Sequence, residues 1–137
     1  MFLKPKRMRE ILLIGAFALT LLGCSGGTPA GVVADAFTAY QSQNSGKLSD
    51  LMSPQGRANA ALLCGGAAIN CLQSNYARAG SVRLKKTFVS KETSTATSVI
   101  LMTEWGSDGK TRCQAFTVDK VSEGWRISFF DSPKLCN

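Results

Sequence analysis

Hydrophobic residues recur at helical spacing in the first half of the chain. Val33, Phe37 and Tyr40 follow one another at i, i+4 and i+7, which predicts a helix from Pro29 to Gln43. Three shorter helical segments are expected after it, around Leu48 to Met52, at residues 57–64 and at residues 68–79. Gly65-Gly66 separates the last two.

From Ser81 onward the hydrophobic period changes to two, which is typical of strands. Strands are expected at residues 81–90, 95–105, 110–121 and 125–130, with turns at 106–109 and 122–124. The expected apolar positions are Val82, Leu84 and Phe88 on the first strand, and on the second Val99, Leu101 and Trp105 on one face with Ile100 and Met102 on the other. Helices followed by an antiparallel meander predict an α+β domain with helices packed on one face of a four-stranded sheet.

The N-terminal segment carries a different signal. Basic residues between Lys4 and Arg9 precede an apolar or small run from Ile11 to Leu22. A bilayer span needs about twenty apolar residues, so this shorter run is typical of a secretory signal peptide. It ends in Leu21-Leu22-Gly23-Cys24, which resembles the lipobox of bacterial lipoproteins, although a small residue is more usual at the place of Leu22.

The lipobox resemblance implies an organisation for the whole chain. Residues 1–23 would be removed, and the Cys24 thiolate, a strong nucleophile, would take a diacylglyceryl group. Residues 24–28 then form a lipidated tether and residues 29–137 a single domain. In enterobacterial sorting, an Asp after the lipidated cysteine is the signal for retention in the inner membrane. Ser25 and Gly26 stand there instead, so the resemblance implies the outer membrane, with the domain facing the periplasm. An ordinary cleaved signal peptide and an uncleaved anchor are the alternatives.

The charge balance is modest once the signal peptide is set aside. Residues 24–137 contain twelve basic and eight acidic side chains, a net charge of +4. This lacks the clustered basic footprint of a nucleic-acid-binding protein. Arg83, Lys85 and Lys86 form one basic cluster, with Arg83 and Lys85 expected on one strand face and Lys86 on the other. Such residues protect an edge strand, or meet lipid headgroups or an acidic partner.

Four cysteines remain besides Cys24, and an even number in an exported chain predicts two disulfides. The expected pairs are Cys64 with Cys71 and Cys113 with Cys136, and their loops contribute about 2.5 and about 3.5 kcal/mol by loop entropy. A zinc site is the alternative. The chain has no C-x₂-C pair and no histidine, so neither a metal nor a cofactor is expected.

Three short motifs carry a further resemblance. They are Pro-x-x-Val-Val-x-x-Phe from Pro29 to Phe37, Leu-Met-Ser-Pro from Leu51 to Pro54, and Gly-Trp-Arg-Ile from Gly124 to Ile127. In this order behind a lipobox, they resemble small lipoproteins with a DUF4878-type domain, which are similar to the NTF2-like, cystatin-like cone. The resemblance implies a curved sheet wrapped on helices with a pocket at the wide end, and it implies no catalytic residue. Residues 57–79 are longer than this pattern expects.

Cone folds of this kind include enzymes that pair a buried Asp base with a Tyr or a protonated acid as oxyanion donor. The material for such a site here is Asp119 or Asp131 with Tyr40 or Tyr76. The aspartates fall at expected strand ends and the tyrosines on helix stripes, where a structural role is common.

The expected function is therefore a non-enzymatic, membrane-tethered domain that binds another envelope protein or a small apolar ligand. Trp105 and Trp125 fit either a pocket wall or the core. One alternative is a small NTF2-like enzyme of isomerase or cyclase type. Another is an accessory lipoprotein of a secretion or conjugation assembly.

Overall fold

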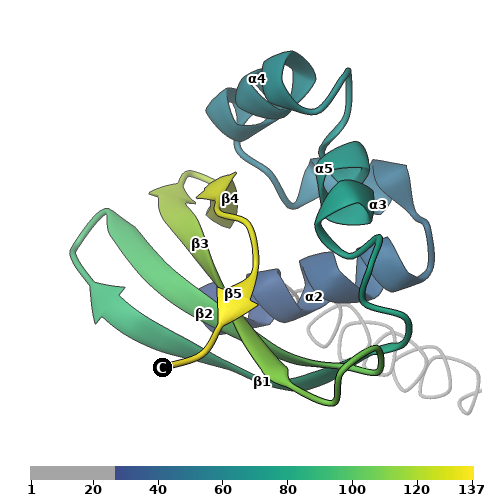
Figure 1. Ribbon diagram of the computed structural model, residues 1–137. Helices are drawn as coiled ribbons and strands as arrows, with labels where there is room; N and C mark the ends of the chain where they lie inside the picture. Colours follow the sequence, from purple (N-terminus) through teal and green to yellow (C-terminus); the bar gives the residue numbers. More distant parts are fainter. Residues whose placement is uncertain (1–26) are drawn as a thin grey trace, which may run out of the picture.

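The computed structural model describes residues 27–137, so the expected signal peptide and Cys24 lie outside the described residues. Four helices precede the strands within this range, which confirms the α+β class and the order of elements (Figure 1). The helices are α2 (Pro29–Gln41), α3 (Ser45–Asp50), α4 (Pro54–Leu63) and α5 (Ala68–Asn75). The strands are β1 (Val82–Glu92), β2 (Ala96–Trp105), β3 (Thr111–Val121), β4 (Gly124–Phe130) and β5 (Lys134–Leu135).

Side-chain caps define where the first helices begin. The Thr28 hydroxyl accepts a hydrogen bond from the Gly31 amide at 3.1 Å, and Pro29 occupies the first turn of α2. Ser53 caps α4 in the same way through the Gly56 amide, at 3.0 Å. The expected second segment forms α3, which already ends at Asp50. Ser53, which was expected to end it, instead caps α4, and α4 begins at Pro54, before the predicted residue 57.

Two helices are shorter than predicted. Helix α2 stops at Gln41 because the chain turns there, and Gln43 adopts a positive φ of 56° that a helix cannot contain. Helix α5 stops at Asn75 instead of residue 79. Beyond it, the Ala79 amide donates to the Tyr76 carbonyl and Gly80 has φ 69°, which redirects the chain into β1.

The sheet is open and antiparallel, with the order β1-β2-β3-β4. The prediction of four strands is incomplete, because the two-residue strand β5 pairs with the beginning of β3. Its register places Leu135 opposite Arg112 and Lys134 opposite Cys113. The bond between Cys113 and Cys136 holds this segment beside β3.

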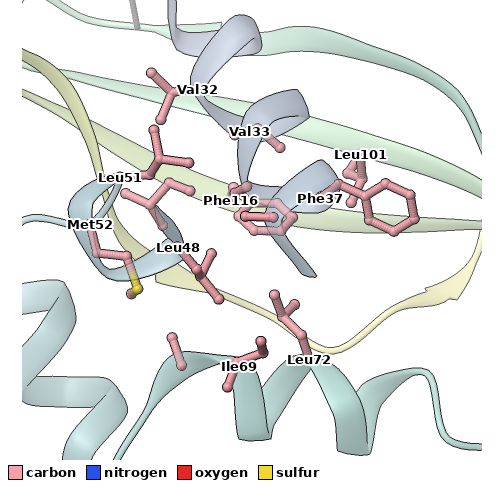
Figure 2. Packing of buried hydrophobic residues seen from close by; sticks show 14 of the residues in the cluster. Val32, Val33, Phe37, Leu48, Leu51, Met52, Ile69, Leu72, Leu101 and Phe116 are labelled. Atoms are coloured by element: carbon pink, nitrogen blue, oxygen red, sulfur yellow. The ribbon is translucent and has the colours of Figure 1, made fainter. Parts of the chain in front are cut away.

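The hydrophobic core lies between the helices and one face of the sheet. Val32, Val33 and Phe37 of α2 point to this face, and all three are at most 2% exposed (Figure 2). Other fully buried side chains come from α3, α5 and the inner face of the strands: Leu48, Leu72, Leu101, Phe116, Val99, Val118 and Ile127. The predicted two faces of β2 are confirmed, since Val99 and Leu101 are buried while Ile100 and Met102 are half-buried.

The predicted faces of β1 are wrong, because the strand contains β-bulges. A register shift between Leu84 and Lys86 inserts one extra residue. Phe88 therefore pairs with Ile100 on the outer face, away from the core. The same shift places Arg83 and Lys86 on the outer face together, with Lys85 at the irregular position, which reverses the expected arrangement of the basic cluster.

Both disulfides have the pairing that the sequence analysis expected. Cys64 and Cys71, whose Cα atoms are 5.0 Å apart, join the end of α4 to α5. Cys113 and Cys136, at 5.1 Å, join β3 to the C-terminal segment. Separately, no helix within residues 27–137 has the length and apolar character needed to cross a membrane.

Candidate binding surface

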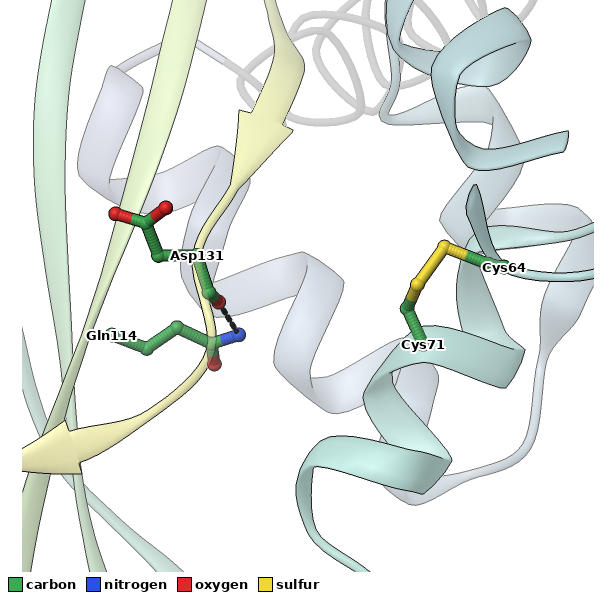
Figure 3. The surroundings of a disulfide bond; sticks show 4 residues. All are labelled: Cys64, Cys71, Gln114 and Asp131. Carbon is green, nitrogen blue, oxygen red and sulfur yellow. Dashed lines mark hydrogen bonds between the residues drawn. A yellow bond between two sulfur atoms is a disulfide. The ribbon is translucent and has the colours of Figure 1, made fainter. Parts of the chain in front are cut away.

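The residues proposed for acid-base catalysis do not form one site. Burial raises the pKa of Tyr76, whose hydroxyl donates to the Oε1 atom of Gln114, and Gln114 is 1% exposed. The Nε2 atom of Gln114 then donates to the backbone carbonyl of Asp131 at 2.6 Å (Figure 3). Asp131 thus contributes its backbone to this network, while the residue itself is exposed.

Asp119 lies on the opposite side of the sheet from the tyrosines. It pairs with Ala96 and Arg126 in the ladder, and its neighbour Val118 is the residue that points into the core. Successive residues of a strand point to opposite faces, so the Asp119 side chain belongs to the outer face. Tyr40 is half-buried in the helix layer, where desolvation raises its pKa.

Aromatic rings fill the interior where the cone resemblance implied a pocket. Phe37, Tyr40 and Tyr76 form a triangle with ring centroids 5.4–6.0 Å apart. Trp105 packs against Tyr76 at 5.8 Å and is 8% exposed, so it is a core residue. The Arg112 guanidinium lies over the Trp105 ring, 4.0 Å from its centroid, in a cation–π contact.

Trp125 is a second aromatic residue that sequence reasoning considered for a pocket. It is half-buried on β4, and the ammonium group of Lys120 lies 5.9 Å from its ring. In the register it pairs with Lys120 near the turn between β3 and β4. This arrangement is cross-strand packing at the end of the sheet.

An apolar groove of about 50 Å³ lies between α4, α5 and β4. Its lining residues are uncharged: Met52, Gly56, Asn59, Ala60, Leu63, Cys64, Cys71, Ser128, Phe129 and Phe130. Leu63 and Phe129 are 74% and 46% exposed, and the adjacent Leu62 is 85% exposed. We call Leu62, Leu63, Phe129 and this groove the α4–β4 surface.

Helix α4 packs closely on β4 through its small residues, while its two leucines stay exposed to solvent. Gly56 and Ala60 are the buried residues of α4, and a Cβ atom on Gly56 would meet the carbonyl oxygen of Ile127. Leu63 continues the stripe of Gly56 and Ala60 at i+7, so it points toward the same side of the helix. Leu63 is nevertheless exposed to solvent. The buried stripe of α4 therefore ends in a leucine that no other part of residues 27–137 covers.

A second, more polar cleft of about 110 Å³ lies among α3, α4 and α5. Arg57 lines it, and its Nη1 atom donates to the Met52 carbonyl at 2.8 Å and to the Ser49 carbonyl at 3.4 Å. The Ser49 carbonyl belongs to the last turn of α3 and the Met52 carbonyl follows the helix, so the Arg57 guanidinium satisfies backbone acceptors at this helix end. Its role in the described structure is therefore structural.

The basic cluster lies along a sheet edge, as one of the sequence interpretations expected. Strand β1 is an outer strand of the sheet, and two register shifts interrupt its ladder with β2. Arg83 and Lys85 both reach Glu104, at 2.7 and 3.9 Å. The Lys86 ammonium lies 5.1 Å from the centroid of the Phe88 ring.

Sequence reasoning missed two features of these surfaces. The helical stretch at residues 57–64 gives no sign that the leucine pair Leu62-Leu63 beside Cys64 is exposed. The chain also has no acidic residue between Asp50 and Glu92, although six basic residues occur there. That segment carries the positive charge of the domain, and the signal was readable from the sequence.

Within residues 27–137, no group of three side chains of the kind that binds metals comes together. No protein-family model matches the chain, and a comparison with curated proteins finds no significant match. The α4–β4 surface and the β1 edge are thus the features from which a function is argued.

Proposed function

We propose that the chain is a lipid-anchored protein of the bacterial envelope whose domain binds another envelope protein through the α4–β4 surface. The observation that carries the proposal is the exposure of Leu62, Leu63 and Phe129 around an uncharged groove. Water contact at such large apolar side chains is unfavourable, and burial against a partner removes it.

The lipobox at Leu21 to Cys24 supports the anchor, and the paired cysteines support export to an oxidising compartment. The bond between Cys64 and Cys71 also bears on the binding site. Both residues line the groove, so the disulfide fixes α4 to α5 at the place where the partner would pack. A preorganised surface loses less entropy on binding.

A protein partner fits this surface better than a small apolar ligand does. Small-molecule pockets usually enclose about 300–1,000 Å³, whereas the groove encloses about 50 Å³ and its leucines project outward. The aromatic rings of Phe37, Tyr76 and Trp105 occupy the space behind the sheet. The expected occupant is an apolar segment of a partner that covers Leu63 and inserts a side chain beside Phe129.

The contribution of one leucine sets the size of the expected effect. Burying a leucine side chain is worth about 2 kcal/mol, which corresponds to about thirty-fold in Kd. The double variant Leu62→Ser/Leu63→Ser should therefore lose the interaction and should fold normally, because both side chains already face solvent. Leu135→Ser is a matched control, since Leu135 is also a leucine that is 52% exposed but lies on β5.

The test uses a photo-crosslinking amino acid placed at position 63 or 135 in living cells. A discrete adduct is expected from position 63 only, and Phe129→Ser should abolish it. The partner in the adduct, once purified, should bind the wild type at least thirty-fold more tightly than the double variant. Absence of an adduct at position 63, or equal binding of the double variant, overturns the proposal.

Two further variants separate binding from catalysis. Asp119→Asn and Asp131→Asn should both fold and complement deletion of the gene, because neither carboxylate lies with the buried tyrosines. A folded aspartate variant that fails to complement, while the Leu62→Ser/Leu63→Ser variant succeeds, would replace the docking proposal by an enzyme.

The anchor has its own experiment. Cys24→Ser removes the only side chain that the lipobox mechanism can acylate, so the protein should leave the membrane fraction or accumulate as the precursor. A processed Cys24→Ser protein that still fractionates with membranes contradicts the anchor without bearing on the α4–β4 surface.

A further inference from the structure

Strand β1 exposes a row of positive charge along one edge of the sheet. Of its eleven residues, only Val82 and Thr87 are half-buried and the rest are exposed. Four of the exposed side chains are basic and one, Glu92, is acidic. Apolar atoms lie among these charges, since Phe88 and Val89 are 36% and 42% exposed.

The two ends of this row differ in how their charges are neutralised. Arg83 and Lys85 share the carboxylate of Glu104. For Lys86 and Lys91, residues 27–137 provide no carboxylate within ion-pair distance. The edge therefore retains net positive charge after its internal ion pairs are counted, and it is complementary to an anionic surface.

The length of the tether brings this domain close to the bilayer. Four residues lie between Cys24 and Pro29 at the start of α2, and the five Cα-to-Cα steps across them span at most about 18 Å when extended. A domain whose first helix begins so near an acylated cysteine has one face within reach of the headgroups.

The topology indicates which face that is. Helix α2 packs across the inner face of the sheet, and the Nε2 atom of Gln41 donates to the Val82 carbonyl at the start of β1. The N-terminal end of α2, which carries the tether, lies toward the end of the sheet that holds the turns between β1 and β2 and between β3 and β4 (Figure 1). The β4 edge at the other side of the sheet is covered by α4, through Gly56 and the hydrogen bond from the Ser53 amide to Ile127.

We propose that the β1 edge lies on the anionic phospholipid headgroups of the membrane that holds the anchor. In this orientation β1 is the strand nearest the bilayer. The α4–β4 surface, at the opposite edge of the sheet, faces away from the bilayer, where a partner can reach it. This inference rests on the lipid anchor of the proposed function. It adds that lipid charge sets the orientation of the domain.

The energetic basis is the attraction of lysines to an anionic bilayer. Each lysine near such a surface contributes a factor of about five to partitioning, and salt screens the attraction within a Debye length. Lys86 and Lys91, the two β1 lysines without an ion-pair partner in residues 27–137, together contribute a factor of about twenty-five by this arithmetic. The oriented state should therefore dominate over anionic lipid at low salt and disappear over neutral lipid.

The experiment measures the amine labelling of each lysine in the lipidated protein, which is reconstituted into vesicles. One vesicle preparation is phosphatidylcholine alone, and the other contains phosphatidylglycerol as well. Mass spectrometry compares two sets of lysines in the same sample. The first set is on β1 and the second is distributed over α3, the hairpin after β2 and β5: Lys85, Lys86 and Lys91 against Lys47, Lys110 and Lys134.

Labelling of the β1 set should fall at least five-fold in the anionic vesicles, return with added salt, and leave the control set unchanged. A reporter dye at position 62 should be unquenched by lipid-borne quenchers in the anionic vesicles, where the domain is oriented. Equal labelling of both sets in anionic vesicles overturns the inference, and so does quenching at position 62. Failure of the protein to float with either vesicle instead contradicts the anchor, so the two failures are distinguishable.

Discussion

The replacement of Gly56 by alanine tests how closely α4 is packed on the sheet. A Cβ atom at this position would approach the carbonyl oxygen of Ile127 to within van der Waals overlap and would lie 3.1 Å from the Cα atom of Ser128. Both neighbours are backbone atoms, so they cannot rotate away as a side chain can. The helix or the strand has to move.

Three contributions determine the size of the effect. Alanine favours a helix over glycine by up to about 1 kcal/mol. Overpacking in a well-packed region costs about 1–3 kcal/mol. Moving Ile127 also weakens its hydrogen bonds from the Ser53 amide and to the Leu51 carbonyl, both 2.9 Å long, at about 1 kcal/mol each. We expect Gly56→Ala to lower the free energy of unfolding by about 2 kcal/mol.

The assay is equilibrium unfolding in urea with both disulfides intact, followed by far-UV circular dichroism. Gly46→Ala is the matched control, because a Cβ atom there would have only the Asn44 Oδ1 atom nearby, at 3.8 Å. The control should be neutral or slightly more stable than the wild type. A Gly56→Ala protein that is as stable as the wild type would refute the close packing of α4 on β4.

Two other variants test the interior and the hairpin. Tyr76→Phe leaves the buried Oε1 atom of Gln114 without its donor, so it should lower the free energy of unfolding in urea by about 1–3 kcal/mol. Tyr40→Phe is the control and should cost less, because the Tyr40 ring is only half-buried. Equal effects of the two variants would contradict the hydrogen-bond network. The Arg112 guanidinium holds the pKa of Asp108 well below its usual value of about 3.9. The ion pair between Asp108 and Arg112 therefore stabilises the fold fully above about pH 4, and this stabilisation is lost as the pH falls further. Asp108→Asn should make the free energy of unfolding depend less steeply on pH in the acid range. An unchanged dependence would count against the ion pair.

Much of the fold follows from local signals in the sequence. The stripe of Val33, Phe37 and Tyr40 predicts α2 because helical periodicity is a property of neighbouring residues. The alternation of Val99 and Leu101 with Ile100 and Met102 predicts both faces of β2 for the same reason. The disulfide pairs follow from the order of the cysteines along helices and strands that the periodicity had already placed.

The failed predictions depend on partners that are distant in the sequence. The bulge near Leu84 has no local signature, because it is defined by the register against β2, and one inserted residue moves Phe88 to the other face. Strand β5 is only two residues long and exists because β3 offers it an unpaired edge. Neither feature is encoded by hydrophobic period.

The candidate site was less predictable than the fold. Leu63 lies on the buried stripe of α4, and whether it is covered depends on how the helix lies along β4, which is a tertiary property. Tyr76 and Asp131 are among the residues that the sequence offers for acid-base chemistry, and the structure connects them through Gln114 and the backbone carbonyl of Asp131. Composition alone gives no indication of that connection.

The connectivity of the disulfides has a consequence for biogenesis. The four cysteines of the domain pair in the order in which they occur, Cys64 with Cys71 and then Cys113 with Cys136. An oxidase that joins cysteines as they emerge from the translocation channel produces this pattern directly, N-terminal pair first. On the proposed export route, maturation of the domain therefore needs oxidation but no reshuffling, and cells that lack a disulfide isomerase should still produce its native form.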